Sequence, residues 1–129
     1  IGKAKCLKKG HKIAVLSTGT IGNNVIQALL KIKKSEDFAH YDFGFVKPLD
    51  ESLLHRIFSD FKEIITIEDG TKTGGFGTSI LEFSASHQYK SNLKILGIPD
   101  EFIEHGTVAE LQQICKIDVE SLEILFSQY

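Results

Sequence analysis

The chain has 129 residues, of which 42% are hydrophobic and 25% are charged, and its formal net charge is -2. These values predict one soluble globular domain and exclude a disordered chain. They also exclude the strongly basic surface of a nucleic-acid-binding protein, and no apolar run approaches the roughly 20 residues of a membrane-spanning helix.

The first two predicted elements are strands, over residues 3–8 and 12–17. The turn between them, residues 9–11, is too short for a crossover connection. We therefore expect the two strands to pair as an antiparallel hairpin.

A helix is expected next, because apolar residues recur at helical spacing: Ile21, Val25, Leu29 and Ile32. Residues 18–20 (T-G-T) supply a turn with a hydroxyl N-cap. A further strand is expected over residues 41–46.

A second helix is expected after Pro48, with Asp50 as its N-cap. Its apolar side consists of Leu53, Leu54, Ile57, Phe58 and Phe61. Residues 64–67 (I-I-T-I) follow as a central strand buried on both faces, because they are β-branched and almost wholly apolar. A glycine-rich loop then leads into a helix over residues 80–83.

The last elements are a strand over residues 93–96 and two helices. Residues 107–110 (T-V-A-E) have the form of a capping box, and Asp118 is the expected N-cap of the final helix.

Strands that alternate with helices predict a three-layer α/β/α sandwich with about five mostly parallel strands and one antiparallel strand at or near an edge. Without repeats or linkers, residues 1–129 are expected to form one domain.

The glycine-rich loop has two interpretations. It contains Gly74, Gly75 and Gly77 between a strand and a helix, where phosphate-binding loops lie. Their spacing does not fit the G-x-G-x-x-G pattern, and no lysine followed by serine or threonine makes a Walker loop. We therefore favour a packing role for these glycines over an anion site.

Glu68 and Asp69 lie at the carboxyl end of the predicted central strand, where α/β folds place ligands. Neighbouring residues of a strand point to opposite faces, so these carboxylates are poor candidates for sharing a proton. A helix cap or an inter-domain salt bridge is the favoured role.

The sequence shows no catalytic constellation. The five histidines have no zinc-ligand spacing: His11, His40, His55, His87 and His105. No serine lies in a G-x-S-x-G elbow. We expect Cys6 and Cys115 to be buried or idle thiols in a reducing cytoplasm. Because the sequence begins at Ile1 and contains no methionine, we expect a fragment of a longer protein.

Three segments carry a family resemblance. They are residues 45–50 (F-V-K-P-L-D), residues 66–77 with T-I-E-D-G and G-G-F-G, and residues 96–106 with G-I-P-D and F-I-E-H-G. In this order and spacing the chain resembles the C-terminal domain of the 1-deoxy-D-xylulose-5-phosphate synthases, a transketolase-like family dependent on thiamine diphosphate. The third segment favours this family over other transketolases. The resemblance covers essentially the whole chain.

The resemblance implies a function for the longer enzyme: condensation of pyruvate with glyceraldehyde 3-phosphate and loss of CO2, for isoprenoid, thiamine and pyridoxal synthesis. It implies thiamine diphosphate and magnesium, held by a G-D-G motif and an asparagine of the first domain and by a glutamate of the second. Nothing in this sequence matches those elements. No catalytic, cofactor or metal residue is therefore expected here, and the fragment is expected to be inactive alone.

The resemblance also implies a packing role within a homodimer. The candidate inter-domain or dimer contacts are Lys47, Pro48, Phe102, Ile103, Glu104 and His105. An alternative for Phe102 is packing in this domain's own core. Gly44 stands where many relatives have arginine, so any ion pair made by that arginine is absent here.

Two other functions stay open at this point. One is the partner-docking C-terminal domain of a 2-oxoacid dehydrogenase beta subunit, or of another transketolase. The other is a free nucleotide-binding domain, which rests only on the glycine-rich loop.

Overall fold

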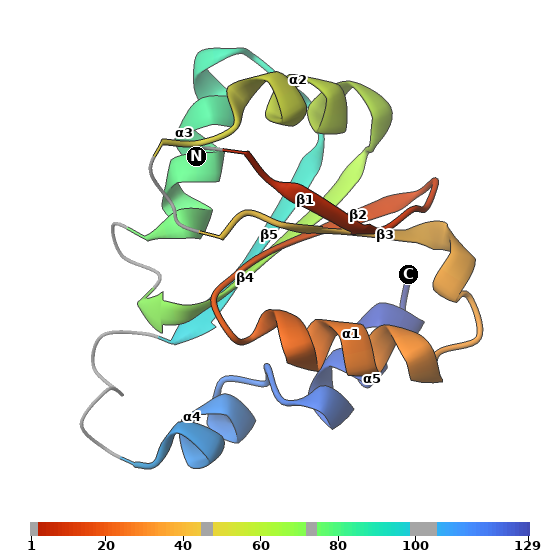
Figure 1. The fold of residues 1–129 in the computed structure, drawn as a ribbon, viewed down its shortest axis with the longest axis vertical. Coiled ribbons are helices and arrows are strands. Elements are labelled where there is room, and N and C mark those ends of the chain that lie inside the picture. Colours follow the sequence, from red (N-terminus) through yellow and green to blue (C-terminus); the bar gives the residue numbers. More distant parts are fainter. Residues whose placement is uncertain (1–2, 45–47, 72–74, 99–105) are drawn as a thin grey trace.

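The computed structural model describes residues 3–44, 48–71, 75–98 and 106–129. A five-stranded sheet lies between two layers of helices, which confirms the predicted α/β/α sandwich (Figure 1). The strands are β1 (Lys5–Lys8), β2 (Ile13–Thr18), β3 (Phe38–Asp42), β4 (Glu63–Thr71) and β5 (Asn92–Ile98). The helices are α1 (Gly22–Lys31), α2 (Glu51–Asp60), α3 (Phe76–Ser86), α4 (Val108–Ile114) and α5 (Val119–Ser127), with a 3-10 turn at Ser35–Asp37.

The strand order is β1-β3-β2-β4-β5. Among the strands of the described residues, only β1 runs antiparallel, and it lies at one edge as expected. Helices α2 and α3 cover one face of the sheet, and α1, α4 and α5 lie on the other (Figure 1). Each face therefore has its own hydrophobic core.

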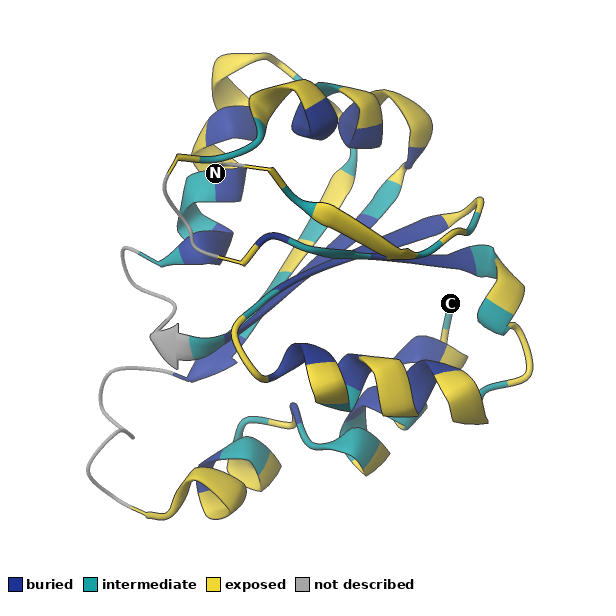
Figure 2. Ribbon diagram, viewed as in Figure 1, coloured by how far each residue is buried: buried dark blue, intermediate teal, exposed yellow. Residues whose placement is uncertain are grey.

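The interior strands are buried because both of their faces are apolar. Ile64, Ile65 and Ile67 of β4 are at most 1% exposed, which confirms the predicted buried strand. Figure 2 shows buried residues along the middle of the sheet and exposed residues on the outer sides of the helices.

The predicted N-terminal hairpin is wrong, because β3 lies between β1 and β2. The short connection steps across the start of β3. At Gly10 a Cβ atom would lie 2.2 Å from the carbonyl carbon of Phe38, so only glycine allows this crossing. The Lys12 amide also donates to the Asp37 carbonyl oxygen (2.9 Å). A short turn cannot join two parallel strands of one sheet. It can join two antiparallel strands that have a third strand between them, as β3 lies between β1 and β2.

Strand β3 begins earlier than the expected residues 41–46. Phe38 and Ala39 are fully buried and pair with β2, so they belong to the strand. Gly44 has a φ of 57°, which ends the extended backbone. The remainder of the predicted strand, residues 45–46, lies outside the described residues.

The helix caps agree with the sequence in part. Asp50 caps α2 by accepting from the Leu53 amide (3.2 Å), and Thr107 and Glu110 form the predicted capping box. Asp118 is the N-cap residue of α5 but makes no capping hydrogen bond with its side chain. The N-cap position of α1 is Ile21, not a hydroxyl residue, so that prediction is wrong.

Candidate functional site

Strands β2 and β4 are parallel neighbours, and the helices that follow them, α1 and α3, lie on opposite faces of the sheet. Ligands of α/β proteins bind outside the carboxyl ends of strands at such a point, where the chain leaves in opposite directions. We therefore treat the carboxyl ends of β2 and β4 as the candidate functional site.

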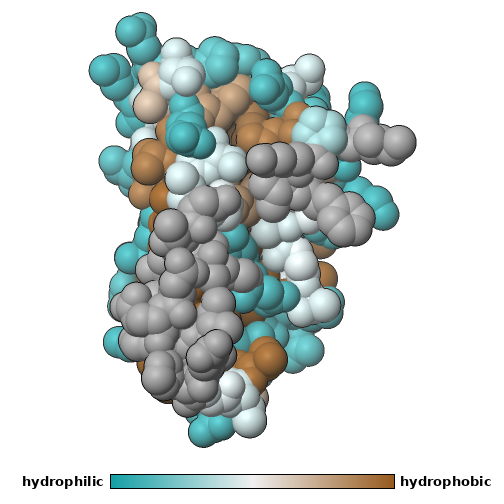
Figure 3. All heavy atoms as spheres, turned by 90° about the vertical axis from the view of Figure 1, so that its left-hand side faces the viewer, coloured by the Kyte–Doolittle hydropathy of each residue, from teal (hydrophilic) through white to brown (hydrophobic). Residues whose placement is uncertain are grey.

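Figure 3 views this end of the molecule from outside. Much of the described surface there is hydrophilic or neutral, with smaller hydrophobic areas. The site's polar groups come from two strand ends, Ser17 and Thr18 on β2 and Glu68 and Asp69 on β4.

Glu68 caps helix α3. Its carboxylate accepts hydrogen bonds from the amides of Phe76 (2.9 Å) and Gly77 (3.1 Å), and the residue is only 5% exposed. These amides are free donors at a helix N-terminus, where a negative charge is also favoured by the helix dipole. The capping role predicted for Glu68 is thus confirmed.

Asp69 performs the same task for helix α1 on the other face. Its Oδ2 atom accepts from the Thr20 hydroxyl (2.7 Å) and from the Ile21 amide (3.1 Å). Gly19 is required beside it, because its φ is 86° and a Cβ atom would lie 2.9 Å from the same oxygen. The cap of α1 therefore comes from a distant strand, which explains why the hydroxyl cap predicted from residues 18–20 is absent.

These two carboxylates occupy the positions that a bound anion would take at the two helix N-termini. The Phe76 and Gly77 amides already donate to Glu68, and Gly77 packs closely: a Cβ atom there would lie 2.4 Å from Cγ2 of Ile95. Gly74 lies outside the described residues. The described part of the glycine-rich loop thus serves helix packing, as favoured from the sequence.

A buried pair of polar residues was missed by the sequence reasoning. The Ser17 hydroxyl and Nε2 of His40 lie 2.7 Å apart, and both residues are at most 1% exposed. Burial lowers the pKa of His40 to about 4, an effect that Asp42 opposes only in part. The alternation of β2 and β3 places both side chains on the α1 face, but the strand expected over residues 41–46 did not include His40.

The chemistry open to this pair is limited. A serine hydroxyl acts as a nucleophile only where it can meet a substrate, and Ser17 is fully buried. The pair therefore joins β2 to β3 beneath the first turn of α1. Among the described residues, no group of three or more His, Cys, Asp or Glu side chains could hold a metal ion.

The predicted contact residues fall largely beyond the described ranges. Pro48 lies within the described ranges and is exposed. The other candidates lie outside the described residues: Lys47, Phe102, Ile103, Glu104 and His105. No helix in the described ranges is long and apolar enough to cross a membrane.

Comparison with known proteins gives a consistent picture. Residues 2–122 match the family model described as "Transketolase, C-terminal domain". The chain is 50% identical over 124 residues to 1-deoxy-D-xylulose-5-phosphate synthase of Bacteroides thetaiotaomicron, covering 95% of this chain and 19% of that protein. It is 50% identical over 123 residues to the synthase of Parabacteroides distasonis, covering 95% and 20%. The chain thus spans about one fifth of the length of these relatives.

Two solved structures share the fold. One is a split-gene transketolase described as an inactive beta4 tetramer, with a TM-score of 0.84 and 20% identity over 98% of this chain and 42% of that one. The other is a transketolase from Campylobacter jejuni, with a TM-score of 0.67 and 15% identity over 99% of this chain and 19% of that one.

Proposed function

The chain belongs to the transketolase C-terminal domain family, and we propose that it is the C-terminal domain of a 1-deoxy-D-xylulose-5-phosphate synthase. The observation that carries this proposal is identity of 50% with such synthases over 95% of the chain. The two transketolase structures described above share 20% and 15% identity with it and support the fold alone.

The longer enzyme would condense pyruvate with glyceraldehyde 3-phosphate and release CO2. Its product would feed non-mevalonate isoprenoid synthesis and also thiamine and pyridoxal synthesis. We propose that it works as a cytoplasmic homodimer with thiamine diphosphate and magnesium. All of these properties belong to the whole enzyme.

The described residues of this chain do not fit the cofactor. A diphosphate bound at a helix start needs free amides, and the Ile21, Phe76 and Gly77 amides at the starts of α1 and α3 already donate to Asp69 and Glu68. Magnesium needs oxygen ligands gathered in one place, and no such acidic group occurs in the described ranges. The cofactor would therefore be held by the other domains.

The contribution proposed for this domain is structural. It would support the neighbouring domain and extend the dimer interface, with Lys47, Pro48 and residues 102–105 as contacts. The exposed position of Pro48 is consistent with this role.

In the full-length enzyme, Phe102→Ser should weaken dimerisation or lower thermal stability. Unchanged dimerisation, stability and activity would refute this contact.

An assay of the full-length enzyme tests the proposed reaction. We expect it to form 1-deoxy-D-xylulose 5-phosphate from pyruvate and glyceraldehyde 3-phosphate, as detected by mass spectrometry of the product. A transketolase would instead require a ketose donor, and a 2-oxoacid dehydrogenase would pass the acyl group to a lipoyl domain. Either result would overturn the proposal.

Calorimetric titration of this chain with thiamine diphosphate and magnesium tests the placement of the cofactor. We expect no binding heat. Micromolar binding would show that the cofactor site includes this domain.

A further inference from the structure

Asp50 binds two segments of the chain at once. Its Oδ1 atom accepts a hydrogen bond from the Leu53 amide (3.2 Å), which caps helix α2, and its Oδ2 atom accepts one from the Ala4 amide (3.1 Å). Serine, threonine or asparagine would cap the helix as well. A carboxylate differs from them in offering two acceptor oxygens. The bond to Ala4, 46 positions earlier in the chain, is therefore a role of Asp50 that capping does not explain.

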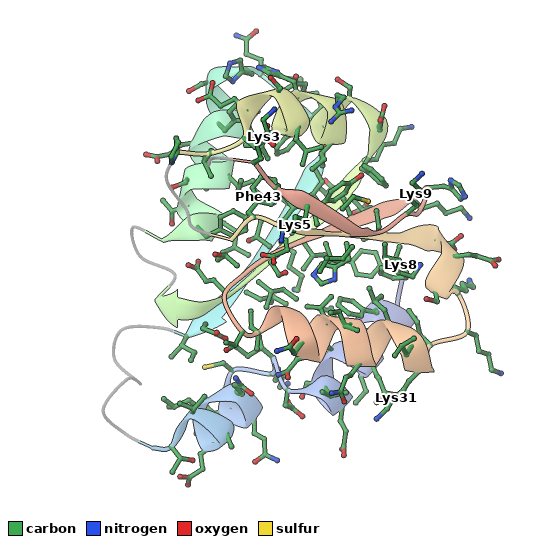
Figure 4. All side chains as sticks on the ribbon, in the orientation of Figure 1. Lys3, Lys5, Lys8, Lys9, Lys31 and Phe43 are labelled. Carbon is green, nitrogen blue, oxygen red and sulfur yellow. The ribbon has the colours of Figure 1, made fainter. Side chains whose placement is uncertain are left out.

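Ala4 lies immediately before strand β1, whose first paired residue is Lys5. Its side chain packs against the hydrophobic core on the face of the sheet that α2 and α3 cover. Figure 4 shows Lys3 on this side of the sheet, beside α2. The chain thus enters the domain at the start of α2, and Asp50 binds the entering segment before that segment joins the sheet.

Strand β1 is held by side chains at both of its ends. Among the described strands it pairs only with β3, it has four residues, and its register with β3 is irregular. A short edge segment of this kind opens more easily than the interior of a sheet. At its far end, the Lys8 ammonium donates to the carbonyl oxygens of Ser35 and Phe38. At its start, the corresponding bond is the one that Ala4 makes to Asp50.

In the proposed function, the rest of the enzyme is joined to this domain through the segment before Ala4. The match to a C-terminal domain begins at residue 2, just before β1, and the chain covers only 19% and 20% of the length of two relatives. The larger part of the enzyme therefore precedes β1. Movements of that part reach this domain first at Ala4 and at the edge strand that follows.

We propose that Asp50 is a positioning residue, which anchors the linker from the preceding part of the enzyme to the start of α2 through the Ala4 amide. This inference rests on the proposed function, in which the chain is the C-terminal domain of a longer enzyme. The anchor brings the linker to the same corner of the domain as the exposed Pro48. The preceding part of the enzyme is thereby held beside Pro48, one of the proposed contacts.

Hydrogen exchange of the full-length enzyme, followed by peptide mass spectrometry, tests the anchor. Asp50→Ser keeps a hydroxyl that caps α2 but removes the second oxygen, which binds the Ala4 amide. Asp60→Ser, at the exposed end of the same helix, is the matched control. We expect exchange in β1 and in the linker before it to be at least about fivefold faster in Asp50→Ser than in the control. Exchange in α3 should be the same in both.

Ala4→Pro tests the same hydrogen bond from the donor side, because proline has no amide hydrogen. Exchange in β1 and the linker should accelerate as it does in Asp50→Ser. The double variant should exchange no faster than the faster single variant, since both substitutions remove one bond. Independent, multiplying effects would show that Asp50 and Ala4 do not act on the linker together, and would overturn the proposal.

Unchanged exchange in the linker of Asp50→Ser would also overturn the proposal. An equal acceleration throughout the domain would do the same, because it would show a loss of general stability. Product formation by the unsubstituted enzyme is measured separately. An enzyme that holds its linker through Asp50 but forms no 1-deoxy-D-xylulose 5-phosphate would refute the proposed reaction and leave the anchor standing.

Discussion

Glu68 and Asp69 are sequence neighbours on strand β4 that cap two different helices on opposite faces of the sheet. Glu68 accepts from two amides at the start of α3, and Asp69 accepts from a hydroxyl and an amide at the start of α1. The alternation of the strand sends one carboxylate to each face. One dipeptide therefore fixes both helices at the point where ligands of other α/β proteins bind.

Replacing Glu68 with glutamine should destabilise the domain by about 1–3 kcal/mol, because the glutamine NH2 group would face an amide donor that Glu68 now satisfies. Urea denaturation gives the free energy of unfolding. Glu82→Gln is the matched control, since Glu82 lies exposed on the same helix, and its effect should be within about 0.5 kcal/mol. Equal effects of the two substitutions would contradict the capping role.

Sequence reasoning found those elements whose signals are local. The capping box at Thr107 and the cap at Asp50 involve residues three apart, and both were predicted correctly. The cap of α1 was missed because Asp69 is 48 residues from Ile21. The edge position of β1 was predicted, but its partner was not, because β3 comes after α1 in the chain and meets β1 through the close approach of Gly10 to Phe38.

The candidate site also contains one feature that the sequence predicted and one that it did not. The opposite orientation of Glu68 and Asp69 follows from strand periodicity and was predicted. The Ser17–His40 pair requires the register between β2 and β3, which hydrophobic patterns define only loosely. Its exact pairing becomes evident only when the strands are placed side by side.

Asp50 links two parts of the chain as well as capping α2. Its carboxylate accepts from the Leu53 amide (3.2 Å) and from the Ala4 amide (3.1 Å), near the N-terminus. Asp50→Ala should therefore cost about 1–2 kcal/mol of unfolding free energy. Asp60→Ala, at the exposed end of the same helix, is the control and should have a much smaller effect. The two free energies are compared by urea denaturation, and a similar loss for both would argue against the cap.

Gly77→Ala should destabilise the domain by about 1–3 kcal/mol, because the added methyl group overpacks a tight contact. It would lie 2.4 Å from Cγ2 of Ile95 and 2.9 Å from Oγ1 of Thr66. Gly106→Ala is the control, since its nearest contact would be an ordinary 3.4 Å. Thermal and urea unfolding measure both variants.

A double variant makes the Gly77 test more specific. Ile95→Ala removes the atom that the new methyl group would strike. The combined loss in Gly77→Ala/Ile95→Ala should thus be smaller than the sum of the single losses. Strict additivity would show that the close contact is not what excludes a side chain at position 77.

His40 should make stability fall in mildly acidic solution. Burial disfavours its charged form and lowers its pKa from the ordinary 6.5 to about 4, although Asp42 acts in the opposite direction. Below pH 6.5 the unfolded chain binds a proton on this ring that the folded chain does not bind. The resulting loss grows as the pH falls towards 4 and reaches about 3 kcal/mol.

The variant His40→Gln isolates this contribution. A glutamine side chain at this position can still hydrogen-bond to Ser17 but does not titrate, so the substitution should remove the His40 part of the pH dependence while leaving that of the carboxylates. The measurement is urea denaturation of both proteins at several values between about pH 7 and about pH 4.5, where the chain with histidine should lose more stability. Parallel pH profiles would mean that the ring binds its proton equally well in the folded and unfolded states. In that case burial would not hold the imidazole neutral.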